Sequence, residues 1–384
     1  MWCNDSAGNS AFNSSNWTIN IDTVYPQIYF NPSTTNISIT SQNSIFINVT
    51  AFDNNKENVF LEWNGVNESF DNSFGDYYWE NKTSLADGVY SFRAYINDST
   101  GNLNFTGLKS IIIDLISPNY TSQNQTINNQ YTTIYHKGEV INLSAFWEDN
   151  NNLSYAWIST NETGIWENKT IYNSPQKLEG NANTSSFNWS NSSVPVGTIV
   201  SWKIYANDSA GNLNFTDEMS FQVWGYSEIG SSYLSPSGIL EGGSTTMYCK
   251  VQDNITSESI QGYPVYFYNE TGLMGTNITG DDGYATWSFS VENAGTYTIT
   301  CNITDNSMLY YNISSNNEGQ AILGVGYGLS VYDYTDTTNN KAYEGDDVDD
   351  ITIFTPIDDP YSDCLLYTSP SPRDLSTSRM PSSA

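Results

Sequence analysis

A six-residue phrase that recurs about every hundred residues constrains this chain more than any other feature. NDSAGN at 4–9 returns as NDSTGN at 97–102 and as NDSAGN at 207–212, and both later copies continue as Leu-Asn-Phe-Thr. The Asp of the phrase recurs at intervals of 93 and 110 residues. That period is too long for the repeat of a helical solenoid, but it fits one β-sandwich per repeat. The sequence therefore predicts a tandem array of similar β modules.

Within each repeat, apolar side chains alternate with polar ones at a period of two. The residues on the predicted inner faces are Tyr90, Phe92, Ala94 and Ile96; Val200, Trp202, Ile204 and Ala206; and Tyr297, Ile299, Cys301 and Ile303. This alternation is typical of half-buried strands in antiparallel sheets. The Asp-Ser-x-Gly-Asn turn supplies a Gly for left-handed backbone and predicts a hairpin. The predicted fold class is all-β, without a helix of ten residues.

These motifs resemble the tandem Ig-like or fibronectin-III-like modules of archaeal and bacterial cell-surface proteins. An alternating strand runs into Asn-Asp-x-x-Gly-Asn, and a further strand ends in Ile-Asp-x-x-x-Pro, at 21–26 and at 113–118. INVTAF at 47–52 and INLSAF at 141–146 align as B strands, and in both a Trp follows the Ala by twelve residues (Trp63 and Trp157). The resemblance implies antiparallel Ig-like sandwiches arranged as beads on a string, with Ala in place of the B-strand Cys. It says little about function.

The joins predict six segments. Residues 1–23 are the last strands of a truncated module, 24–117 an Ig-like module, 118–226 a module with an enlarged loop, 227–324 a module with a disulfide, 325–363 the start of a truncated β module, and 364–384 a non-native tail. That tail, CLLYTSPSPRDLSTSRMPSSA, resembles a translated sequencing adapter and is excluded from fold reasoning. The start has no basic or apolar leader region, so we expect a fragment open at both ends.

Composition excludes several function classes. With 12 Lys and Arg against 42 Asp and Glu, the net charge of −30 disfavours nucleic acid or an anionic membrane as a partner. No apolar run approaches 18 residues, so no membrane-spanning helix is expected in this fragment. His136 is the one His, which argues against catalysis by paired His residues and is expected in a surface loop. We expect neither an enzyme nor a cofactor.

Cys249 and Cys301 fall on the strands that the resemblance assigns as B and F. They form either a disulfide across the sandwich or a pair of reduced, buried thiols. A disulfide would contribute roughly 2–4 kcal/mol and would place the chain in an oxidising, extracellular compartment.

Asn-x-Ser/Thr triplets recur through the chain and predict N-glycosylation. The candidate sites are Asn48, Asn104, Asn142 and Asn214, each followed by an apolar residue expected to point inward while the Asn points to solvent. A surface strand rich in Asn and Thr also produces such triplets by alternation alone. The triplets are therefore either glycosylation sites or a by-product of strand composition, and both interpretations stay open.

Acidic clusters and aromatic residues are the remaining candidates for ligand contact. Glu148-Asp149, Asp281-Asp282 and Asp346–Asp350 are either solvated acidic loops or Ca²⁺ sites at module joins, and none has the spacing of an EF-hand. Trp63, Trp157, Trp202 and Trp287 are expected in cores. Trp79 and Trp166, in the two WENKT repeats, are the candidates for ligand-contacting aromatics.

Together these patterns predict a non-catalytic, extracellular scaffold or adhesion section of a glycosylated cell-surface protein. Its partners would be cell-surface or envelope components, including glycans. Two alternatives stay open: an accessory β-sandwich region of a large secreted hydrolase, and an array of carbohydrate-binding modules. The sequence does not name the ligand, the organism, the anchor, the number of modules in the parent protein or the sequons that are used.

Overall fold

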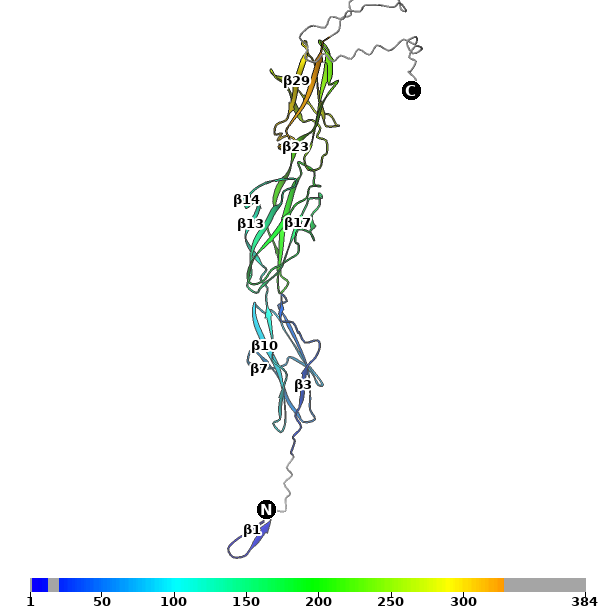
Figure 1. Ribbon diagram of the computed structural model, residues 1–384. Helices are drawn as coiled ribbons and strands as arrows, with labels where there is room; N and C mark the ends of the chain where they lie inside the picture. The colour runs from blue at the N-terminus through cyan, green and yellow to red at the C-terminus, as the bar shows by residue number, and fades with distance from the viewer. Residues whose placement is uncertain (1, 13–20, 328–384) are drawn as a thin grey trace, which may run out of the picture. The chain divides into compact units, whose positions relative to one another are not determined.

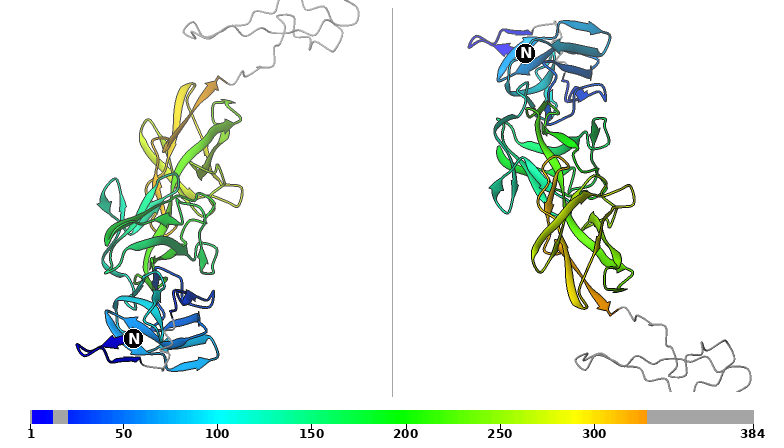
Figure 2. Two further views of the ribbon diagram at one scale, coloured as in Figure 1. Left: turned by 90° about the horizontal axis from the view of Figure 1, so that it is seen from below. Right: turned by 90° about the horizontal axis from the view of Figure 1, so that it is seen from above.

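The computed structural model describes residues 2–12 and 21–327, and every regular element within them is a β-strand (Figures 1 and 2). This confirms the predicted all-β class. None of the described residues forms a helix that could cross a bilayer. The predictions for residues 13–20 and 328–363, for the acidic run at 346–350 and for the tail at 364–384 lie outside the described part. At the N-terminal end, β1 (Trp2–Asn4) and β2 (Ser10–Phe12) form a hairpin around the first NDSAGN turn.

The first sandwich packs two sheets around a shared core. One sheet has the order β3 (Gln27–Phe30), β5 (Ile45–Phe52), β9 (Tyr77–Lys82), β8 (Asn72–Phe74). The other has the order β4 (Ile39–Thr40), β12 (Lys109–Ile113), β10 (Gly88–Asp98), β6 (Lys56–Trp63), β7 (Val66–Ser69), with β11 (Leu103–Phe105) also paired to β10. All pairs are antiparallel except β4 with β12. Buried residues from both sheets, among them Ile47 and Phe92, form the core.

The second sandwich repeats this plan. One sheet has the order β14 (Gln130–Tyr131), β13 (Asn119–Ile127), β16 (Ile141–Glu148), β20 (Ala182–Trp189). The other runs β18 (Glu167–Asn168), β17 (Leu153–Thr160), β21 (Ile199–Asp208), β23 (Met219–Ser235), and β15 (Ile134–His136), β19 (Gln176–Lys177) and β22 (Leu213–Phe215) are paired to it. The core contains three fully buried Trp residues, Trp147, Trp189 and Trp202.

The third sandwich begins on the strand that ends the second. β23 pairs with β21 through its first residues and with β25 (Ser244–Asp253) through its last, and β28 (Tyr284–Ser290) and β30 (Tyr311–Ile313) complete that sheet. The facing sheet has the order β24 (Gly238–Leu240), β31 (Glu318–Gly326), β29 (Gly295–Asn302), β26 (Pro264–Asn269), β27 (Gly272–Ile278). The boundary predicted near Tyr226 thus falls inside a strand common to both sandwiches.

His136 lies beside this common strand. Its ring stacks on Tyr226 with centroids 4.6 Å apart, and its Nε2 is 2.8 Å from Asn312 Oδ1. The expectation of a surface loop residue is therefore wrong: His136 ends β15, which pairs with β23.

The predicted inner faces are confirmed in all three sandwiches. Phe92, Ala94 and Ile96, then Val200, Trp202, Ile204 and Ala206, then Ile299, Cys301 and Ile303 are buried, while Tyr90 and Tyr297 pack at core margins. Trp63 and Trp287 also pack against their cores.

Trp157 is the exception, because it lies on the outer face of β17 while its neighbours Ala156 and Ile158 are buried. The reason is register. β5 and β16 are both eight residues long and begin at Ile45 and Ile141, so Ala51 corresponds to Trp147 rather than to Ala145. The loop after β16 (149–152) is also one residue longer than the loop after β5 (53–55), so counting twelve residues from Ala145 ends at a position that corresponds to Phe60, which also faces outward.

Candidate functional site

The repeated Asp-Ser-x-Gly-Asn turn closes one end of each of the first two sandwiches. Asp98 Oδ1 accepts hydrogen bonds from the backbone N–H groups of Thr100 and Asn102, both at 2.9 Å, and Asn102 Nδ2 donates to Asp98 Oδ2 at 2.7 Å. Burial opposes ionisation of Asp98, but the hydrogen bonds from Asn102 and Thr100 outweigh it and lower its pKa to about 2. Asp208 and Asn212 repeat these contacts at 2.9 and 2.7 Å.

The Asn side chains after each turn hold the chain segment that enters the sandwich. Asn102 Nδ2 donates to the carbonyl of Asp22 at 3.2 Å, and Asn212 Nδ2 donates to that of Asp114 at 2.9 Å. The Ile-Asp-x-x-x-Pro joins and the recurring turns, far apart in the sequence, are therefore two sides of the same contact.

Asn104 and Asn214 belong to this contact too, which corrects the orientation expected of these two sequons. Their Nδ2 atoms donate to the carbonyls of Pro26 and Pro118 at 2.7 and 2.8 Å. The middle residues Phe105 and Phe215 are instead 54% and 50% exposed.

The other two sequons keep the expected alternation. Val49 and Leu143, the middle residues after Asn48 and Asn142, are buried. Asn48 Nδ2 donates to Ser33 Oγ at 2.9 Å, and Asn142 Nδ2 donates to Ser186 Oγ at 2.6 Å. Glycosylation at all four positions stays a prediction.

Three carboxylates converge at the end of each sandwich where the entering segment is held. We call Asp22, Asp53 and Asp98 the first acidic pole and Asp114, Asp149 and Asp208 the second; within each pole, one carboxylate oxygen of each residue lies within 4.8 Å of the others. The first Asp comes from the entering segment, the second follows β5 or β16, and the third ends β10 or β21. An all-oxygen group of this kind can hold a hard divalent cation.

Only one of these six carboxylates belongs to an acidic cluster that is visible in the sequence. Asp149 is at the second pole, but its neighbour Glu148 is exposed, and Asp282 accepts a hydrogen bond from the N–H of Tyr284 in a turn instead of joining such a group. The signal for Asp22, Asp98, Asp114 and Asp208 was present, because an Asp recurs in both the joins and the turns. Their proximity depends on the sandwich topology, which places those segments at the same end.

Each of the first two sandwiches carries a row of half-buried and exposed aromatic rings on its outer face, at equivalent positions. Trp157 stacks on Tyr205 at 5.7 Å, and Tyr205 packs on Phe215 at 5.4 Å. The matching set in the first sandwich is Phe60, Tyr95 and Phe105, with centroid separations of 4.9 and 5.7 Å. We call these two sets the aromatic strips.

A cation covers each strip. The Arg93 guanidinium lies 4.9 Å from the Tyr95 ring, and Lys203 Nζ lies 5.7 Å from that of Phe215. The strips are therefore amphipathic surfaces of stacked rings with a charged edge.

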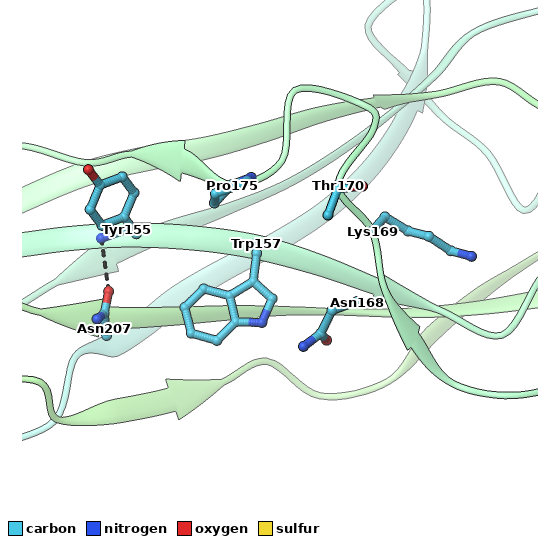
Figure 3. Close-up of a pocket in the computed structure, with 7 residues that line it drawn as sticks. All are labelled: Tyr155, Trp157, Asn168, Lys169, Thr170, Pro175 and Asn207. Carbon is cyan, nitrogen blue, oxygen red and sulfur yellow. Dashed lines mark hydrogen bonds between the residues drawn. The ribbon is translucent and has the colours of Figure 1, made fainter.

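A shallow depression beside Trp157 adds polar groups to the second strip (Figure 3). Asn168, Pro175 and Asn207 line it, and Asn207 Oδ1 accepts a hydrogen bond from the Tyr155 N–H at 3.0 Å (Figure 3).

The structure separates the two Trp residues predicted to contact a ligand. Trp166 is 43% exposed, and Lys203 Nζ lies 5.2 Å from its ring, so it extends the second strip. Trp79 is half-buried in β9, on the opposite sheet of the first sandwich, so it does not join a strip.

Cys249 and Cys301 are joined by a disulfide with Cα atoms 6.7 Å apart. They link β25 in one sheet to β29 in the other and are fully buried in the core. Cys3 has an exposed free thiol.

The sheet architecture is that of tandem Ig-like or fibronectin-III-like β-sandwiches. No protein-family model and no curated protein matches its sequence. Among solved structures, the I67–I69 I-band fragment of titin is 7% identical with a TM-score of 0.46, covering 80% of this chain and 100% of that one. The Ca²⁺-stabilised, ice-binding adhesin of an Antarctic bacterium is 14% identical with a TM-score of 0.35, covering 85% and 80%. The fibronectin(III)-like modules of Clostridium thermocellum CbhA are 13% identical with a TM-score of 0.29, covering 51% and 93%. At this level of similarity, no ligand or activity is carried over from them.

Proposed function

We propose that this chain is a non-catalytic, extracellular scaffold or adhesion section of a glycosylated cell-surface protein. The observation that carries the proposal is the repetition of one building plan: each sandwich has its own core, and the second passes β23 directly into the third. A chain of repeated sandwiches presents similar binding surfaces one after another along the sequence, and this role requires no catalytic centre. Its net charge of −30 suits a soluble, self-repelling surface, and the Cys249–Cys301 disulfide suits an oxidising exterior.

Proteolytic shaving of intact source cells, followed by peptide mass spectrometry, tests this location and role. We expect peptides of the chain in the shaved fraction, with Cys249 disulfide-linked to Cys301 and hexoses on at least some sequons. Recovery only from the lysed-cell fraction, with both thiols reduced and every sequon unmodified, would reject the proposal.

The aromatic strips favour carbohydrate as the bound partner, which is the second candidate function. Stacked Trp and Tyr rings offer flat apolar faces that sugar rings can cover, and nearby amides and cations offer hydrogen bonds to hydroxyl groups. The rings repeat across neighbouring strands, not along one strand, and they line no deep pocket, as binding to an extended polysaccharide requires.

Replacing both Phe60 and Trp157 by Ala is expected to weaken polysaccharide binding about tenfold or more, because aromatic anchors dominate most binding surfaces. Affinity electrophoresis through gels containing β-glucan, xylan, mannan or soluble peptidoglycan measures the effect. Trp79→Ala is the matched control, since its ring lies outside the strips. If the parent chain migrates unretarded through every gel, or if the control loses as much affinity as the double variant, the strips do not bind glycans.

A further inference from the structure

We infer that the two acidic poles are Ca²⁺ sites that bind each entering segment to its sandwich, with the second pole the tighter site. This inference is independent of the scaffold proposal, which uses none of these six carboxylates.

The first reason is that the structure builds the same group twice. Each pole takes one Asp from the segment before the sandwich, one from the loop after β5 or β16, and one from the end of β10 or β21. The lengths of chain between the second and third Asp differ, at 45 residues in the first pole and 59 in the second. The same three carboxylates still meet, although the loops between them differ.

The second reason is that buried oxygen atoms at the second pole lack a partner. Asp114 is fully buried, and its Oδ2 has no hydrogen-bond partner, whereas its Oδ1 accepts from the Ile116 N–H and from Asn150 Nδ2, both at 3.2 Å. Asp149 repeats the pattern: Oδ1 accepts from the Asn151 N–H at 2.8 Å, and Oδ2 is buried without a partner. A buried carboxylate oxygen with nothing to accept is costly, and a cation facing both atoms would remove that cost.

The third reason is the unbalanced charge. None of the ion pairs formed by Lys, Arg or His among the described residues involves any of the six carboxylates. Three like charges at this spacing destabilise the fold unless a cation lies between them.

The donor chemistry selects Ca²⁺. Each pole offers oxygen ligands without Cys or His, which excludes the sulfur and nitrogen sets preferred by zinc and copper. Two oxygens on opposite sides of a Ca²⁺ lie about 4.6–5.2 Å apart, which accommodates the spacing at both poles, and Ca²⁺ tolerates irregular geometry that Mg²⁺ does not. Water would complete the six to eight ligands.

The two poles differ in how completely their oxygens are already engaged. At the first pole, Asp22 and Asp53 are only partly buried, and Asp22 Oδ2 accepts a hydrogen bond from Asn55 Nδ2 at 2.8 Å. A cation there must compete with Asn55 and with water. The second pole, with two unpartnered oxygens and two fully buried Asp residues, is therefore expected to bind more tightly.

The third sandwich supplies a contrast. Asp253 ends β25 in a comparable turn and accepts from the Ile255 N–H at 3.0 Å, but the chain enters through the continuous strand β23. No third group of converging carboxylates occurs among residues 2–12 and 21–327. The carboxylate groups thus coincide with the joins where an irregular segment must be fixed in place.

The test starts from the whole chain after treatment with a chelator. Isothermal calorimetry measures the titration with CaCl₂, and thermal unfolding is recorded with and without Ca²⁺. We expect two binding events per chain and a rise in the midpoint of the corresponding transitions by about 5 °C or more at saturating Ca²⁺. Asp149→Asn should abolish one event, and Asp53→Asn the other. Glu148→Gln, an exposed neighbour of Asp149, is the matched control and should keep both events.

The sign of the stability change separates a metal site from a structural role. Without Ca²⁺, Asp149→Asn should melt at or above the parent because it removes repulsion; with Ca²⁺ it should melt below the parent. Absence of both heat and a shift at millimolar Ca²⁺, or an equal response to MgCl₂, would overturn the inference. So would unchanged stoichiometry in both Asn variants.

Discussion

Replacing Trp202 by Ala is expected to destabilise the second sandwich by about 3–5 kcal/mol, the usual cost of deleting a fully buried aromatic side chain. The ring lies in the core, and its Nε1 donates to Gln125 Oε1 at 2.8 Å. Gln125 is itself fully buried, and its Nε2 donates to the carbonyls of Thr132 and Ser220 at 2.8 and 2.9 Å. The substitution therefore leaves both a cavity and an unpaired buried carbonyl.

Calorimetric unfolding of the full chain measures this effect, because a loss of this size lowers a module's transition by at least about 10 °C. Trp166→Ala is the matched control in the same sandwich: its ring is 43% exposed, so we expect a change within about 0.5 kcal/mol. Trp202→Phe should fall between the two, because it keeps most of the ring volume but still leaves Gln125 without its donor. Equal stability of Trp202→Ala and Trp166→Ala would contradict the assignment of this core.

The position of Trp202 was predictable because alternation alone places a residue on the inner face of a strand. The inner face of β21 needs only a period of two, and an error of two residues in aligning repeats leaves it unchanged. The expected core position of Trp157 depended instead on a count of residues that crosses a loop, where a difference of one residue reverses the face. INVTAF and INLSAF look equivalent in the sequence, but they occupy different positions in their strands. β5 begins two residues before INVTAF, whereas β16 begins at the first residue of INLSAF. Counting across a loop of different length then reversed the face.

The acidic poles and the aromatic strips required information that local pattern does not contain. Asp98 and Asp208 were visible as turn residues, and Asp22 and Asp114 as residues of the joins, but their meeting depends on which strand ends share one end of a sandwich. The strips depend likewise on β6 or β17 lying beside β10 or β21. In both cases the residue types were recognisable, and the missing element was the pairing of distant strands.

Removing the disulfide is expected to produce the other large effect, a loss of roughly 4 kcal/mol from the third sandwich. In the chain-entropy account, a cross-link spanning 52 residues restricts the unfolded chain by about this amount. The bond also ties β25 to β29 through the middle of the core, so its loss loosens contact between the two sheets. The measurement is chemical unfolding with and without reductant in a Cys3→Ser background, which removes the exposed thiol.

A Cys249→Ala/Cys301→Ala variant controls for the reductant, which should no longer affect unfolding. Pulling single molecules gives an independent readout, because the bond withholds the enclosed 52 residues from extension. At about 3.3–3.6 Å per residue, reduction should lengthen the extension gained when the third sandwich unfolds by roughly 17–19 nm. An unchanged length after reduction would mean that the two sulfurs are not bonded in the folded protein. The oxidising location would then lose its strongest support, whereas the β-sandwich fold, which rests on strand pairing and buried apolar residues, would stand.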